Sequence, residues 1–142
     1  REKMTLYVET SALLSWLFGE PEGSKAAEAI DKASVVVTSK LTLLEAQRTL
    51  VRAGAEKNLT EADQGKARRA LEDAVGAWEL MEITSEVYSR ASLPFPSEPL
   101  RTLDAIHLST MLVFVYLYRD LTVLSYDERI RRNAQALGLP VV

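Results

Sequence analysis

Short apolar runs alternate with helix-forming stretches along this chain, and this alternation limits the folds open to it. The runs are rich in Val, Leu, Ile and Thr, as buried strands are, and lie at residues 4–8, 35–38, 80–83 and 121–124. Strands separated by helices pair in parallel through right-handed crossovers, which leaves a sheet covered on both faces. We therefore predict an α/β fold, a three-layer α/β/α sandwich around a central parallel sheet.

Helices are expected between the predicted strands, with residues 92–99 as a loop and 140–142 as a short edge strand. The expected helices cover residues 12–18, 24–32, 41–53, 60–77, 84–91, 103–118 and 126–137. Thr10 or Ser11 would cap the first of them, and Thr102 the long apolar one. Gly54 and Gly138 would end two others.

The length and composition predict one domain spanning residues 1–142, because 142 residues suffice for a core and no linker or repeat divides them. The chain has no cysteine, which excludes disulfides and thiolate metal sites and permits a reducing, cytoplasmic location. The start lacks the apolar run of a secretory signal, and we expect Met4 to be the natural first residue. Residues 108–118 are too short to span a bilayer, so no membrane is expected.

Four acidic residues follow strands or lie near helix starts: Glu9, Glu45, Asp104 and Asp127. In open parallel sheets, ligands bind beyond the carboxyl ends of the strands, so all four can point into one crevice. Gathered carboxylates repel one another, and some would hold protons unless a cation relieved the repulsion. Oxygen ligands suit hard cations, so the acids predict a Mg²⁺ or Mn²⁺ site for phosphoryl or nuclease chemistry.

Each acid also has a structural explanation. Ser125 to Glu128 has the form of a capping box, in which Asp127 only decorates the cap. Glu45 could pair with Arg48 on an exposed helix face. Asp104 is harder to explain in this way, because it begins a helix that is apolar nearly all round and therefore buried. The shared placement of the four acids carries the functional interpretation.

Four segments resemble the PIN-domain family, and within it the VapC-type toxin ribonucleases of toxin–antitoxin pairs. The segments are residues 7–13, 43–46, 103–108 and 124–127. Together with the order of strands and helices and the length, the resemblance covers essentially the whole chain. The resemblance implies a Mg²⁺- or Mn²⁺-dependent endoribonuclease that hydrolyses RNA. It also implies a homodimer and a cognate antitoxin that inhibits the enzyme.

Carried over to this chain, the resemblance implies that Glu9, Glu45, Asp104 and Asp127 form the catalytic acidic site. Glu9, Asp104 and Asp127 would hold the metal, and Ser11 and Ser125 would support them by hydrogen bonding. The family usually has Asp where this chain has Glu9, and a misplacement of about 1 Å costs roughly 100-fold in rate. The alternative is therefore a PIN-fold binding module with weakened catalysis.

Other polar residues are weaker candidates for a functional role. His107 is the only histidine, and we interpret it as a core residue outside the site. Lys40 and Arg48 are the weakest candidates, as contacts to the RNA backbone. The net charge of −3 argues against a broad basic face for nucleic acid. A signalling receiver domain is also acidic and doubly wound, but no lysine follows Lys66, as that class would require.

Overall fold

The computed structural model describes residues 4–142, so residues 1–3, which would precede the expected natural start at Met4, lie outside this range. The described chain contains four strands and seven helices. In order they are β1 (Thr5–Val8), α1 (Thr10–Leu17), α2 (Gly23–Lys32), β2 (Val35–Ser39), α3 (Lys40–Ala55), α4 (Glu61–Gly76), β3 (Glu79–Met81), α5 (Ser85–Ala91), α6 (Thr102–Leu117), β4 (Leu121–Leu124) and α7 (Glu128–Ala136).

The strands form one parallel sheet in the order β3-β2-β1-β4. In register, Thr5 pairs with Val35 on one side of β1 and with Leu121 on the other. Strands β2 and β3 follow β1 on one side of the sheet, and β4 pairs with β1 on its other side. The order of strands therefore reverses between β1 and β4, where ligands of such sheets bind.

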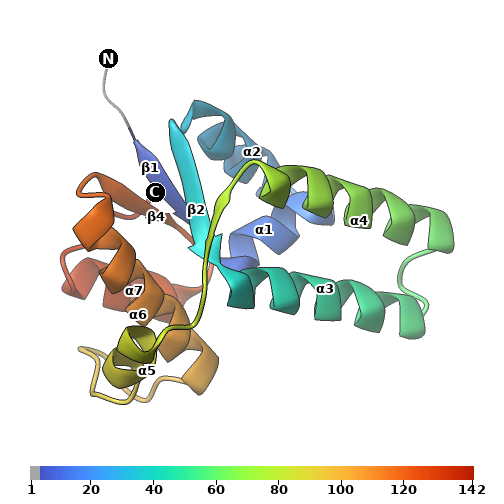
Figure 1. The fold of residues 1–142 in the computed structure, drawn as a ribbon. Coiled ribbons are helices and arrows are strands. Elements are labelled where there is room, and N and C mark those ends of the chain that lie inside the picture. Colours follow the sequence, from blue (N-terminus) through green and yellow to red (C-terminus); the bar gives the residue numbers. More distant parts are fainter. Residues whose placement is uncertain (1–3) are drawn as a thin grey trace.

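Helices cover both faces of the sheet, as the alternation of strands and helices predicts. Leu6 and Val8 of β1 point into a core shared with α1, α2, α3 and α4. Tyr7, one residue between them, points to the opposite core, which α6 and α7 close. The two groups of helices lie on either side of the sheet in Figure 1, where α3 and α4 extend together away from it. The three-layer α/β/α fold is confirmed.

Three predicted caps are wrong in detail. Helix α1 begins at Thr10 with Glu9 at its cap position, and α6 begins at Thr102 with Arg101 at its cap position; neither start has a side-chain cap. At α7 the capping side chain is that of Asp127 and not that of Ser125. Asp127 accepts hydrogen bonds from the backbone amides of Arg129 and Ile130. The hydroxyls of Thr10 and Ser125 bond to carboxylates brought from elsewhere in the chain, which local sequence does not reveal.

Two other boundaries differ from the prediction. Helix α3 continues through Gly54 to Ala55, and Gly54 lies against the side chain of Gln64 on α4. A Cβ at this position would meet the end of that flexible side chain, and the glycine does not end the helix. The expected edge strand at 140–142 is reduced to one bridge between Val123 and Val141. Within the described residues, every helix is too short or too polar to cross a membrane.

Candidate acidic active site

The four predicted acids lie around the carboxyl ends of the central strands. Glu9 directly follows β1, and Asp127 lies between β4 and α7. Glu45 is in the second turn of α3, which follows β2, while Asp104 is in the first turn of α6. Because β2, β1 and β4 are adjacent, the fold places elements carrying the acids at one edge of the sheet.

Glu9 is held by the two predicted serines. Its carboxylate is buried, and Oε1 accepts hydrogen bonds from Ser11 Oγ at 2.5 Å and from Ser125 Oγ at 2.6 Å. The serine hydroxyls accept in turn from the backbone amides of Tyr126 and Asp127. Glu9 is therefore tied to the start of α7, although 116 residues separate it from Ser125.

Glu45 does not pair with Arg48. Its Oε1 accepts a hydrogen bond from Thr10 Oγ1 at 2.5 Å and lies 2.7 Å from His107 Nε2. Burial alone would raise the pKa of Glu45, but the net shift is downward, and the hydrogen bonds that Glu45 accepts from His107 and Thr10 contribute to it. Glu45 is therefore ionised at neutral pH, because hydrogen-bond donors stabilise its charge.

Arg101 links two of the acids. Its Nε donates to Oδ2 of buried Asp104 at 3.1 Å, and its Nη2 lies 3.8 Å from Oδ2 of Asp127. The hydrogen bond and charge of Asp104 are the main causes that raise the pKa of Arg101, and the charges of Asp127 and Glu45 raise it further. Three of the four acids therefore act electrostatically on one guanidinium group.

Glu9, the remaining acid, acts electrostatically on the buried phenol of Tyr7. The hydroxyl of Tyr7 lies in the core behind the site, and its burial raises the pKa of the phenol strongly. The negative charges of Glu9 and Glu45 raise the pKa of Tyr7 further. The charges of Glu9 and Glu45 therefore both act on Tyr7, and those of Glu45, Asp104 and Asp127 all act on Arg101, so Glu45 links the two groups.

Three of the acids make their hydrogen bonds with one oxygen only. Glu9 and Glu45 each use Oε1 for their hydrogen bonds, and Asp127 uses Oδ1 to cap α7. Within residues 4–142 no hydrogen bond is made by the second carboxylate oxygen of any of these three. This arrangement fixes each carboxylate and leaves one oxygen of Glu9 and of Glu45 for a cation, a water or a substrate. The second oxygen of Asp127 faces Arg101 at 3.8 Å. For Asp127 the structural and functional interpretations are therefore compatible.

The donor set of the site suits a divalent metal, but the arrangement of its side chains in the described part of the chain does not yet form a metal cluster. All four acids offer hard oxygen ligands, and the site already holds a positive group, Arg101, between Asp104 and Asp127. The oxygen donors fit Mg²⁺ or Mn²⁺, whereas the guanidinium already occupies two of the acids that a cation would use. Among residues 4–142, however, no three Asp, Glu or His side chains are arranged as a ready metal cluster. Each carboxylate is oriented toward its own hydroxyl, imidazole, amide or guanidinium partner.

The predicted RNA-contacting residues give little additional support. Lys40 begins α3 and forms an ion pair with Glu82, so it has a partner other than a phosphate. Arg48 is exposed on α3, and no ion pair involving it occurs in the described chain. Of the arginines that follow Asp127, Arg131 pairs with Glu128 at 3.6 Å. Contacts of Lys40 and Arg48 with RNA stay predictions.

Three residues around the acids were not predicted as part of the site: Thr10, Arg101 and His107. Their signals in the sequence are weak. Arg101 lies three residues before Asp104 and His107 three residues after it, spacings that bring side chains together on a helix. Thr10 directly follows Glu9 but resembles an ordinary helix cap.

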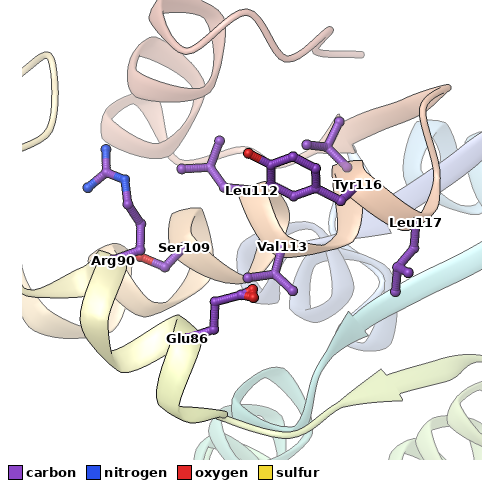
Figure 2. Close-up of a pocket in the computed structure, with 8 residues that line it drawn as sticks. Glu86, Arg90, Ser109, Leu112, Val113, Tyr116 and Leu117 are labelled. Atoms are coloured by element: carbon purple, nitrogen blue, oxygen red, sulfur yellow. The ribbon is translucent and has the colours of Figure 1, made fainter.

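A separate apolar pocket lies between α5 and α6 and contains none of the four acids. Figure 2 shows Leu112, Val113 and Tyr116 of α6 along this pocket, with Glu86 and Arg90 of α5 beside them. Ser109 Oγ is buried there and forms no hydrogen bond in the described structure. The pocket is therefore distinct from the acidic site.

Comparison with known proteins identifies the family. The model of the PIN domain matches residues 6–136. Ribonuclease VapC35 of Mycobacterium tuberculosis is 31% identical over 139 residues, which cover 96% of this chain and 95% of that protein. Both matches extend across nearly the entire chain and thus include all four acids.

Solved structures share the fold at lower sequence identity. VapC20 of Mycobacterium tuberculosis, described as a sarcin–ricin loop cleaving toxin, has a TM-score of 0.64 and 16% identity, with 94% of this chain and 95% of that chain covered. A toxin–antitoxin complex from Klebsiella pneumoniae has a TM-score of 0.61 and 22% identity, with coverage of 96% and 95%. These likenesses support the fold of the chain.

Proposed function

Because this chain belongs to the PIN-domain family, and within it to the VapC-type ribonucleases, we propose that it is a metal-dependent endoribonuclease. The observation that carries the proposal is the grouping of Glu9, Glu45, Asp104 and Asp127 around Arg101, Thr10 and His107 at the reversal point of the sheet. The reaction would be hydrolysis of an RNA phosphodiester by water.

Glu9, Asp104 and Asp127 would hold Mg²⁺ or Mn²⁺. When bound, such an ion polarises a phosphate and lowers the pKa of a coordinated water. Asp104 and Asp127 already hold a positive charge, the guanidinium of Arg101. Glu45 has a lowered pKa and stays ionised at neutral pH, so its role would be to orient water through Oε2 and not to store a proton.

The proposal is tested with purified protein and pooled cellular RNA. The RNA is incubated with Mn²⁺, with a chelator, and with chelator followed by excess Mn²⁺, and the cut ends are mapped. We expect discrete cleavage with Mn²⁺, loss of cleavage with the chelator, and recovery when the ion is restored. Cleavage that is equal in all three reactions, or absent from all three, would contradict a metal-dependent nuclease.

The alternative is a PIN-fold binding module with weakened catalysis. Two observations favour it: Glu9 stands where the family usually has Asp, and the acids of the described chain are not posed as a ready metal cluster. A binding module would retain RNA without cutting it. Binding of RNA in a gel-shift experiment, together with no cleavage under Mn²⁺, would support this alternative.

The partners follow from the family assignment. The similarity to a toxin–antitoxin complex supports a role as the toxin of such a pair, inhibited by a cognate antitoxin. We also propose a homodimer and a cytoplasmic location, where RNA and antitoxin would both be present. Light scattering that shows only monomer at micromolar concentration would contradict the dimer.

A further inference from the structure

His107 lies behind the acidic site. It is in α6, one turn after Asp104, and only 1% of its side chain is exposed. Its ring contacts side chains from three other elements: Tyr7 of β1, Thr10 of α1 and Glu45 of α3. Any buried imidazole needs polar partners for its ring nitrogens, but one of the partners of His107 is a proposed active-site acid.

The hydrogen bonds run in a chain from the core to the site. Tyr7 Oη lies 3.0 Å from His107 Nδ1, and His107 Nε2 lies 2.7 Å from Glu45 Oε1. The phenol of Tyr7 is fully buried and carries a proton at neutral pH, which it can donate to Nδ1. The Glu45 carboxylate can only accept, so the hydrogen bond to it needs a proton on Nε2, and Nδ1 is the ring nitrogen placed to accept from Tyr7.

The contact with His107 also engages one particular carboxylate oxygen of Glu45. Both His107 and Thr10 bond to Oε1, so the carboxylate is held by two donors on one side. The side chain of Glu45 is 25% exposed, whereas that of His107 is buried, so the hydrogen bond spans the boundary between core and site. The second oxygen of Glu45 is thereby available to a ligand on the solvent side.

We propose that His107 is a positioning residue, whose Nε2–H, oriented by Tyr7, fixes the Glu45 carboxylate for its role in the acidic site. This inference rests on the proposed function, in which Glu45 orients water. A fixed donor behind a metal-site or active-site carboxylate typically affects metal affinity or activity by about 10- to 100-fold.

The proton position is tested without any substitution, because His107 is the only histidine in the sequence. Protein labelled with ¹⁵N-histidine gives one pair of ring nitrogens in a long-range ¹H–¹⁵N spectrum. We expect the tautomer with Nε2 protonated and Nδ1 bare. In Tyr7→Phe, which removes the donor to Nδ1, that preference is expected to weaken. A wild-type ring with the proton on Nδ1 alone would overturn the proposal.

Two amide variants test the positioning role. In His107→Gln the amide nitrogen can reach the place of Nε2 and donate to Glu45, whereas the shorter amide of His107→Asn reaches only the place of Nδ1. We expect Asn to lower the rate of RNA cleavage by about 10- to 100-fold and Gln to restore most of it. The midpoint of urea unfolding, measured for both, separates this effect from a loss of folded protein.

A double-substitution cycle adds a readout that a purely structural histidine would not give. In a Glu45→Gln background, His107→Asn should cause little further loss of cleavage, because the residue it positions is already changed. Equal activity of wild type, His107→Gln and His107→Asn would overturn the positioning role while leaving the nuclease proposal intact. A wild type that does not cut RNA would contradict the nuclease itself, and the tautomer experiment would still report on His107.

Discussion

Asp104→Asn is expected to lower metal-dependent RNA cleavage by on the order of 100-fold or more while leaving the fold intact. Asp104 is 6% exposed at the start of α6, and its charge is balanced in the structure by Arg101. Asparagine has nearly the same volume but no charge, so it keeps the packing and weakens the attraction for a cation. The measurement is the initial rate of cleavage at saturating Mn²⁺, with thermal unfolding followed in parallel.

The matched control is Asp73→Asn, the same chemical change on the exposed surface of α4. It should leave both the cleavage rate and the unfolding temperature close to those of the wild type. Cleavage by Asp104→Asn at the wild-type rate would remove Asp104 from the catalytic site.

Glu9→Gln is expected to reduce cleavage by about 100-fold, because a neutral amide replaces the buried carboxylate held by Ser11 and Ser125. Glu9→Asp keeps the charge but shortens the side chain. Since the two serine hydroxyls are placed for glutamate at 2.5 and 2.6 Å, we expect aspartate to be misplaced by about 1 Å. Its rate should fall by about 10- to 100-fold.

The same pair of variants separates the nuclease from the weakened binding module. If glutamate at position 9, in place of the aspartate usual in the family, has weakened catalysis, Glu9→Asp should cleave RNA faster than the wild type. A gain of this kind would support the alternative and contradict the view that Ser11 and Ser125 adapt the site to glutamate. Rates for both variants are compared at equal protein and Mn²⁺ concentrations.

The architecture could be predicted because its signals are local. Each strand is a short run of β-branched and apolar residues, and the helices between them force parallel pairing. The acids could be placed at one edge of the sheet for the same reason: Glu9 and Asp127 immediately follow strands that the fold makes neighbours. This inference requires the order of elements but no side-chain geometry.

The connections among the acids could not be predicted because they join distant segments. Thr10 has the sequence context of a helix cap, and only the arrival of Glu45 from α3 gives its hydroxyl another partner. His107 resembles a core residue until Tyr7 and Glu45 are placed on either side of its ring. Arg101 precedes its helix and carries no pattern of its own, yet it balances Asp104 and Asp127.

Calorimetric titration with Mn²⁺ tests most directly whether the scattered acids make one cation site. The wild type should bind the ion, and Glu9→Gln, Asp104→Asn and Asp127→Asn should each weaken binding, while Asp73→Asn should not. Asparagine is a good helix cap, so Asp127→Asn should keep α7 in place and change mainly the charge. No binding by the wild type, or the same affinity in all five proteins, would contradict the shared site.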